Sequence, residues 1–263
     1  MISGNTRLFA ILADPVAQVR TPQVLNGYFA ARGVDAILVP MHVAAENLEE
    51  VLGGLRRMKN LGGFIVTVPH KIAIARLCDA LGPAAQAVGS VNTVRRTADG
   101  RLVGDMFDGA GFVGGLRSQG HDPEGKRALL VGAGGAASAI AFALSEAGAS
   151  RVTVANRTRA KAEAVVEHVR RALPQADIGV GEADPRGYDM VVNGTSLGMR
   201  PDDPLPLDVA RLEPRVLVAE IIMKPELTPL LEAARQRGCP VHYGRHMLDC
   251  QVELMARFMF DRS

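Results

Sequence analysis

The chain has 263 residues, 48% of them hydrophobic, and its 30 lysines and arginines against 28 aspartates and glutamates leave a formal net charge of +2. This composition excludes an intrinsically disordered chain, and the small net charge excludes a general nucleic-acid binder or a protein held on a membrane by its charge. The length favours two domains with a cleft between them, and because we find neither a secretory signal pattern nor an apolar run of about 18 residues, we expect a soluble cytoplasmic protein.

The first half of the chain alternates short apolar runs with segments of helical periodicity, which favours an α/β domain with a mostly parallel sheet. Thr21 is the expected N-cap of the first helix, with Pro22 at its first position. The turn signal Ala98-Asp99-Gly100 lies between two further apolar runs and predicts a hairpin. The predicted strands are 7–12, 35–40, 63–69, 90–96 and 101–107, and the predicted helices are 21–33 and 44–60.

The alternation begins again at about residue 126, which predicts a second α/β unit. We therefore expect one domain over residues 1–107 and another over 108–245. Apolar residues at helical spacing predict a final helix over about 246–263 that packs back on the first domain. The strands predicted in the second unit lie within 126–135, 150–158, 188–195 and 215–222.

A glycine-rich turn follows the first strand of the second unit and opens a helix. Its pattern G-x-G-x-x-A, with Gly132, Gly134 and Ala137, is typical of Rossmann-like dinucleotide sites, where the backbone approaches a pyrophosphate at a helix N-terminus. Such a turn alone is weak evidence, and its strand-turn-helix context makes nucleotide binding the favoured interpretation. The predicted cofactor-binding residues of this turn are Gly132, Ala133, Gly134, Gly135 and Ala136.

The end of the next strand favours NADP over NAD. An NAD site usually carries a carboxylate there for the ribose 2′-hydroxyl. This sequence has Asn156, Arg157 and Thr158, with Lys161 one turn later. A guanidinium can pair with a 2′-phosphate, which a carboxylate would repel. The alternative is a solvated basic start of a helix, which the helix dipole disfavours.

Six further segments stand out along the chain: GFIVTVPHK (63–71), GSVNTV (89–94), GDMFDGAGF (104–112), NGTSLGM (193–199), KPELTPLL (224–231) and GRHMLDCQ (244–251). In this order they resemble the motifs of the shikimate dehydrogenase family, which includes quinate dehydrogenases. The similarity runs from about residue 8 to the C-terminus, whereas isolated motif matches would not follow one another in this way.

The resemblance implies an oxidoreductase that reversibly reduces 3-dehydroshikimate, or a related cyclic keto acid, with NADP in the shikimate pathway of aromatic amino acid biosynthesis. It implies that Lys71 and Asp108 form the catalytic pair, between a substrate-binding and an NADP-binding domain. An ammonium beside a carboxylate suits the proton transfer that accompanies hydride transfer, and the sequence leaves open which of the two transfers the proton. Further implied residues are Thr21, Thr67, Asn92 and Gln251 for the substrate and Thr195, Ile221, Gly244 and Met247 for the cofactor.

The sequence departs from the family pattern where the substrate carboxylate is usually held by two serines and a tyrosine. Here Val19, Thr21 and Met223 stand at those positions, and Ile65 replaces an asparagine that contacts ring hydroxyls. Because unpaired buried polar groups cost on the order of 1–3 kcal/mol each, we expect shikimate to bind less well, and quinate, an amino analogue or a less polar relative remain open as substrates. Arg20 either binds the carboxylate in place of the serines or is a surface residue.

A protein that binds NADP with little or no turnover, such as a sensor, is the alternative function. It explains the lost substrate contacts, but it does not explain why Lys71, Asn92, Asp108 and Gln251 all match the motifs. The odd number and spacing of Cys78, Cys239 and Cys250 predict small buried side chains rather than disulfides, and no residue pattern suggests a metal. We expect a monomer or homodimer whose partner is a small molecule.

Overall fold

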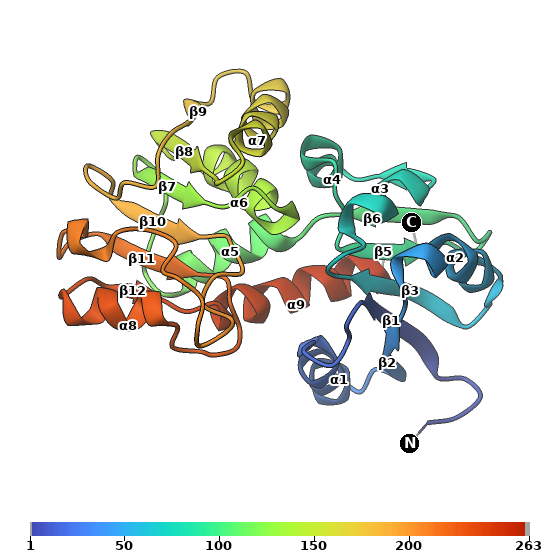
Figure 1. Ribbon diagram of the computed structural model, residues 1–263. Helices are drawn as coiled ribbons and strands as arrows, with labels where there is room; N and C mark the ends of the chain where they lie inside the picture. The colour runs from blue at the N-terminus through green and yellow to red at the C-terminus, as the bar shows by residue number, and fades with distance from the viewer. Residues whose placement is uncertain (1, 261–263) are drawn as a thin grey trace. The chain divides into compact units, whose positions relative to one another are not determined.

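The computed structural model describes residues 2–260, and its chain divides into two compact units (Figure 1). Unit 1 contains the described residues up to Phe107 and those from Val252 onward, and unit 2 is Asp108–Gln251. Residue 1 and residues 261–263, which were included in the predicted first domain and final helix, lie outside the described residues. Among residues 2–260, we find no helix with the length and apolar character needed to cross a bilayer.

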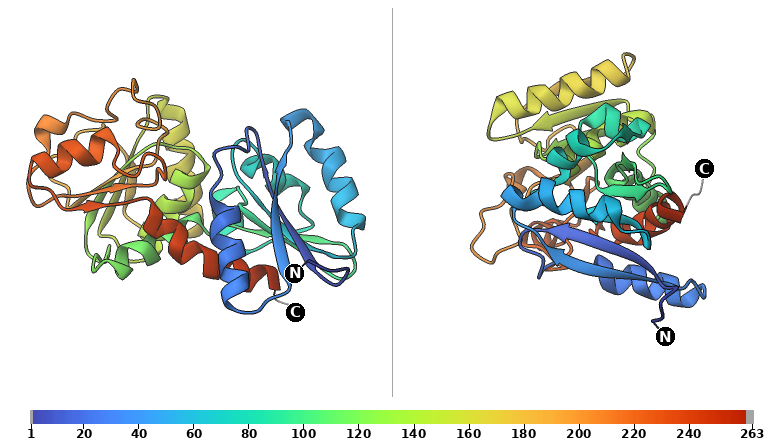
Figure 2. Two further views of the ribbon diagram at one scale, coloured as in Figure 1. Left: turned by 90° about the horizontal axis from the view of Figure 1, so that it is seen from below. Right: turned by 90° about the vertical axis from the view of Figure 1, so that its right-hand side faces the viewer.

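Unit 1 is built on a six-stranded mixed sheet in the order β2-β1-β3-β5-β6-β4. Helices α1 and α2 lie on opposite sides of this sheet, as the left view of Figure 2 shows. The elements are β1 (Arg7–Ala13), α1 (Thr21–Ala31), β2 (Ala36–His42), η1 (Ala45–Asn47), α2 (Leu48–Arg57), β3 (Leu61–Val66), α3 (Lys71–Leu77), β4 (Ala80–Leu81), α4 (Pro83–Val88), β5 (Thr93–Arg96) and β6 (Leu102–Asp105).

The strand directions in unit 1 bring several loops to one edge of the sheet. Strand β3 runs parallel to β1 and antiparallel to β5, with Ile65 opposite Thr93. Strand β5 runs antiparallel to β6, with Thr93 opposite Asp105. The C-terminal ends of β1, β3 and β6 therefore meet the start of β5 at this edge. The loops that leave it carry the substrate-binding and catalytic residues expected in the first domain.

Two local predictions in unit 1 were wrong. Arg20, not Thr21, is the N-cap of α1, because Val24 N–H already bonds Arg20 O (3.4 Å), and no side chain caps this helix. Strand β3 ends at Val66 rather than at residue 69. Pro69 has no N–H for the ladder, and His70 N–H bonds Thr67 O (2.9 Å), which turns the chain toward α3.

Unit 2 is built on a six-stranded parallel sheet in the order β12-β11-β10-β7-β8-β9. Strands β9 and β12 have three and two residues, too short for a sequence pattern, and were not predicted. The elements are α5 (Asp108–Ser118), β7 (Arg127–Val131), α6 (Gly135–Glu146), β8 (Arg151–Ala155), α7 (Arg159–Ala172), β9 (Ile178–Val180), β10 (Met190–Asn193), η2 (Val209–Arg211), β11 (Leu217–Glu220), α8 (Pro229–Gln236), β12 (Val241–His242) and α9 (Arg245–Phe260).

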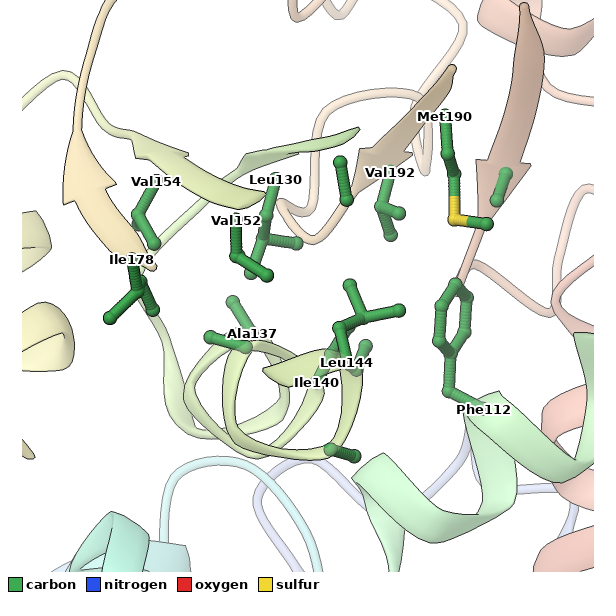
Figure 3. Packing of buried hydrophobic residues seen from close by; sticks show 14 of the residues in the cluster. Phe112, Leu130, Ala137, Ile140, Leu144, Val152, Val154, Ile178, Met190 and Val192 are labelled. Carbon is green, nitrogen blue, oxygen red and sulfur yellow. The ribbon is translucent and has the colours of Figure 1, made fainter. Parts of the chain in front are cut away.

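Helix α6 packs its apolar face on this sheet. Ala137, Ile140 and Leu144 are fully buried and point toward the side chains of the central strands, and Phe112 of α5 lies beside Met190 (Figure 3). The packing of this helix on the sheet thus holds the preceding glycine turn in place. The part of α9 that belongs to unit 1 ends with Phe260, whose ring lies 5.0 Å from that of Phe9.

A buried histidine is expected to make unit 2 sensitive to acid. His242 is 1% exposed, its Nε2 has no hydrogen-bond partner among the described residues, and its ring lies 5.9 Å from that of Phe112 and 5.0 Å from that of His246. Burial, with smaller effects of His246 and His121, lowers the pKa of His242 from 6.5 to about 4. The unfolded chain therefore binds a proton between these values that the folded chain does not.

We expect the free energy of unfolding to fall by up to about 3 kcal/mol through this histidine as the pH drops from about 6.5 toward 4. Urea denaturation of the parent and His242→Leu across this range measures the contribution as the difference between the two pH profiles. The exposed His168→Leu serves as the control and should follow the parent. Parallel profiles for the parent and His242→Leu would exclude this source of acid sensitivity.

Candidate functional site

Lys71 lies at the sheet edge of unit 1, where β3 ends and α3 begins. Its backbone carbonyl accepts a hydrogen bond from Val91 N–H (2.9 Å), one residue before Asn92. Thr67, three residues before the helix cap, is half-buried, and its N–H donates to Leu12 O (3.1 Å) at the end of β1. The backbone therefore brings Thr67, Lys71 and Asn92 to adjoining segments of one edge.

His70 anchors the start of α3 directly before Lys71. Its side chain is 1% exposed, and Nε2 lies 2.8 Å from Val43 O. A buried ring bonded to a neighbouring loop limits how far the helix start can move, so His70 helps to fix Lys71. From the sequence, His70 is expected to be only a neighbour of Lys71 without a chemical role, and its anchoring bond could not be predicted because the partner is a backbone carbonyl 27 residues away in the chain.

Asn92 holds the segment that leads to Asp108. It is 2% exposed, and its Oδ1 accepts hydrogen bonds from Thr93 Oγ1 and from Phe107 N–H, both at 3.0 Å. Phe107 is the residue before Asp108. Asn92 therefore fixes the backbone directly before Asp108.

Asp108 and Gln251 form a buried pair in unit 2. Gln251 Nε2 donates to Asp108 Oδ1 (2.6 Å), and the two residues are 3% and 6% exposed. Asp108 is the first residue of α5, where the positive end of the helix dipole favours a carboxylate. A Cβ at Gly111 would lie 2.8 Å from Cβ of Gln251, so this glycine allows α9 to approach α5 closely enough for the pair to form.

Val19 and Arg20 end the segment between β1 and α1, which leaves the same edge of the unit 1 sheet, and Thr21 is the first residue of α1. Val19 and Thr21 are half-buried and Arg20 is exposed. This edge therefore offers one hydroxyl, one guanidinium and one apolar side chain from a single short segment. The pattern fits a pocket wall that is less polar than one built from serines.

A pocket of about 620 Å³ lies in unit 2 at the C-terminal ends of β7 and β8. Gly134 is at the N-cap of α6, and a Cβ there would meet nothing within 4 Å, so the space in front of the helix is open. Gly132 has φ 122°, and a Cβ there would lie 2.6 Å from Gly194 O, so only glycine fits this turn. Seven predicted cofactor residues line the pocket: Ala133, Gly134, Asn156, Arg157, Thr158, Lys161 and Thr195.

The other six predicted cofactor residues are not among those that line the pocket. Gly132, Gly135 and Ala136 belong to the same turn and helix start as Gly134. A Cβ at Gly244 would lie 2.4 Å from Ile222 O and 2.8 Å from the carbonyl carbon of Ile221, so the backbone at Gly244 contacts residues 221–222. Met247 is 5% exposed and belongs to the hydrophobic core of unit 2.

Sequence reasoning missed one wall of the pocket. Residues 180–183 line it, together with Pro206. Residues 180–183 begin at the last residue of β9, whose three residues are too few to show an alternation that would have placed this segment beside β8. The signal that could have located this segment is the alternation of strands and helices in the second unit, which predicts a further parallel strand after α7.

The pocket wall formed by the end of β8 and the start of α7 is basic. Arg157 and Lys161 are exposed there, whereas Arg159 is engaged with Glu163 (2.9 Å). Asn156 Nδ2 donates to Thr158 O (2.9 Å) and shapes the turn between strand and helix. A phosphate group placed at this wall would meet positive charge, and the helix N-terminus of α6 adds to it.

The three cysteines lie in the described part of the chain, and none of them belongs to a cluster of candidate metal ligands there. In the part of the chain that the structure describes, we find no group of three or more His, Cys, Asp or Glu side chains that could hold a metal ion. Cys239 is buried and its Sγ donates to Glu213 O (3.3 Å), while Cys78 and Cys250 are half-buried. Burial raises the pKa of Cys78 to about 12, which makes its thiol unreactive at neutral pH.

Comparison with known sequences gives two family matches. The model described as shikimate dehydrogenase substrate binding domain matches residues 11–94, and the model described as shikimate / quinate 5-dehydrogenase matches residues 116–186. The chain is 41% identical, over 252 residues, to the shikimate dehydrogenase (NADP(+)) of Rubrobacter xylanophilus. This match covers 94% of the chain and 88% of the relative.

Solved structures of similar proteins have the same architecture along nearly their whole length. A crystal structure of a shikimate dehydrogenase in complex with NADP+ superposes with a TM-score of 0.92 at 30% identity, covering 99% of this chain and 92% of that one. The ligand-free 5-ketofructose reductase of Gluconobacter sp. strain CHM43 superposes with a TM-score of 0.88 at 30% identity, covering 98% of this chain and 94% of that one.

Proposed function

The chain belongs to the shikimate dehydrogenase family, and we propose that it catalyses the NADP-dependent interconversion of shikimate and 3-dehydroshikimate. The observation that supports the proposal best is the set of polar groups that the fold fixes at the family motifs. Lys71 and Asn92 adjoin at the sheet edge of unit 1, and Asp108 is paired with Gln251 in unit 2. A protein that only sensed NADP would not need this set.

The pocket of unit 2 fits NADP. The open space before Gly134 suits a pyrophosphate at the helix N-terminus, and Arg157 and Lys161 suit a 2′-phosphate. Thr195 lines the opposite wall, formed by the loop after β10. Hydride transfer to or from the substrate carbon is the chemistry that bound NADP would supply.

Lys71 and Asp108 would handle the proton. When the alcohol is oxidised, its hydroxyl oxygen loses a proton as the carbon loses a hydride. A basic group must therefore lie within hydrogen-bond reach of the hydroxyl oxygen. We assign this role to Lys71 and Asp108 together, with Gln251 orienting the carboxylate through its bond to Oδ1. Asn92 would donate to a ring hydroxyl, as would Thr67. Unit 1 would accordingly hold the substrate, and unit 2 the dinucleotide.

A neutral polyol ketone is the second candidate substrate. Val19 and Met223 stand where family members donate hydrogen bonds to a carboxylate, and one of the structural relatives is a 5-ketofructose reductase. A carboxylate left without those donors would bind less tightly by on the order of 1–3 kcal/mol for each lost partner. Arg20 is the residue in this segment that could compensate for them.

A substrate screen tests the proposed function and separates the two candidates. We expect the protein to reduce NADP+ with shikimate, followed as absorbance of the reduced nicotinamide, and to do so faster than with quinate. The reverse assay compares 3-dehydroshikimate with 5-ketofructose as NADPH oxidants. Activity with 5-ketofructose alone would identify the keto sugar as the substrate. NADP binding without turnover on any compound would support the alternative function as an NADP sensor.

Replacing Arg20 shows whether it holds the carboxylate. We expect Arg20→Leu to raise the KM for shikimate by on the order of tenfold, because a charge-assisted hydrogen bond is lost, with little change in the KM for NADP. The control is Arg32→Leu, since Arg32 lies at the other end of α1 with its guanidinium over the ring of Tyr28 (3.7 Å). An unchanged KM for shikimate would identify Arg20 as a surface residue.

A further inference from the structure

Glu220 is a buried carboxylate that the proposed reaction does not use. It is the last residue of β11, is 0% exposed, and lies opposite Asn193 in the neighbouring strand β10. Burying a carboxylate costs several kcal/mol unless its oxygens are paired, so a group in this place needs an explanation.

Four groups donate hydrogen bonds to the oxygens of Glu220. Oε1 accepts from Asn193 Nδ2 and from Thr228 Oγ1, both at 2.9 Å. Oε2 accepts from the N–H groups of Ile221 (3.3 Å) and Ile222 (3.5 Å). An ionised carboxylate can accept all four, whereas a protonated one would turn a hydrogen toward a donor. These four hydrogen bonds therefore favour the anion and oppose the effect of burial, which raises the pKa of this carboxyl.

Through Asn193, the carboxylate is connected to the wall of the nucleotide pocket. Asn193 Nδ2 donates to Leu197 O (3.0 Å), and its Oδ1 accepts from Thr195 N–H (3.1 Å) and Thr195 Oγ1 (2.7 Å). Thr195 and Leu197 both line the pocket. With Glu220 in place, the amide of Asn193 has one fixed orientation, in which both ends of the turn 195–197 are held.

The second arm of the network leads away from the pocket. Thr228 is the N-cap of α8, and its Oγ1 accepts from Leu231 N–H (3.3 Å). Thr228 is fully buried and does not line the pocket. The carboxylate thus has one hydrogen-bonded connection to the pocket wall and another to the cap of a helix. Substitutions can remove each connection separately.

We propose that Glu220 is a positioning residue for the dinucleotide, which acts through Asn193 to hold the turn 195–197 against the bound cofactor. The inference rests on the proposed function, because it assumes that this pocket takes NADP. It predicts that the carboxylate contributes to cofactor affinity more than to turnover at saturating NADP.

The test compares Glu220→Gln, Asn193→Leu and Thr228→Val by titration of NADPH fluorescence and by steady-state kinetics. In Glu220→Gln an amide N–H₂ must face either Asn193 and Thr228 or the two backbone N–H groups, so donors are left without an acceptor. We expect Glu220→Gln and Asn193→Leu each to weaken NADPH binding by on the order of tenfold, with kcat within about twofold of the parent. The double variant should be no weaker than the single ones.

Thr228→Val is the matched control, because it cuts the other arm of the same carboxylate. It should lower the unfolding temperature and leave the Kd for NADPH unchanged. A parental Kd in folded Glu220→Gln would overturn the inference, as would an equal loss of affinity in Thr228→Val. If Glu220→Gln does not fold, Asn193→Leu decides in the same way. Failure of the parent to bind NADPH would instead refute the proposed function.

Discussion

Replacing Lys71 with alanine is expected to lower kcat for shikimate oxidation by about 10²–10⁴-fold, the usual contribution of a positioned acid or base. Lys71 is one of the two groups to which we assign the transfer of the hydroxyl proton, and its helix start is fixed by the buried His70 and by the bond from Val91 N–H. The dissociation constant for NADPH should stay at the parental value, because Lys71 does not line the nucleotide pocket.

Three further variants make this result specific. Lys71→Arg keeps a positive charge but has a pKa too high to release a proton near neutral pH, so it should be nearly as inactive as Lys71→Ala. Asp108→Asn should also lose most of the activity. Lys59→Ala, between α2 and β3, removes a charge elsewhere in unit 1 and should behave as the parent. Near-normal turnover of Lys71→Ala on the true substrate would remove the proposed proton role.

Replacing Arg157 with aspartate is expected to reduce the preference for NADP over NAD, measured as the ratio of the two kcat/KM values, by about 100-fold or more. Arg157 is exposed on the basic wall of the pocket, directly after the end of β8. The substitution removes a charge-assisted pair with the 2′-phosphate and adds a carboxylate that repels the phosphate and can accept from a ribose hydroxyl.

The control for this exchange is Arg171→Asp. Arg171 lies in the last turn of α7 and is paired with Glu167 (2.6 Å), outside the residues that line the pocket. Arg171→Asp changes the net charge by the same amount as Arg157→Asp, so a general electrostatic effect on a charged cofactor would appear in both variants. If Arg157→Asp kept the parental preference for NADP, the assignment of the 2′-phosphate to this wall would be refuted.

The sequence by itself determined the features that depend on local pattern. Strand β7, the turn at Gly132 and helix α6 could be predicted from an apolar run, two glycines and a helical stripe, because each feature involves neighbouring residues. The two α/β units and the NADP cofactor, confirmed by the family comparison, followed from the same patterns and from the motif resemblance. Arg157 and Lys161 were expected at the pocket because the end of a parallel strand is where such a pocket forms.

The tertiary structure alone decided which distant groups meet. The bond between Asp108 and Gln251 joins residues 143 positions apart, and it depends on how closely α9 approaches α5 at Gly111. The four donors around Glu220 come from one strand, the loop directly after Glu220 and a helix cap, and the sequence does not show that Asn193 and Thr228 meet there. Hydrogen-bond partners of this kind are fixed by strand register and helix packing, which are set by the whole core and leave no periodic signal in the residues themselves.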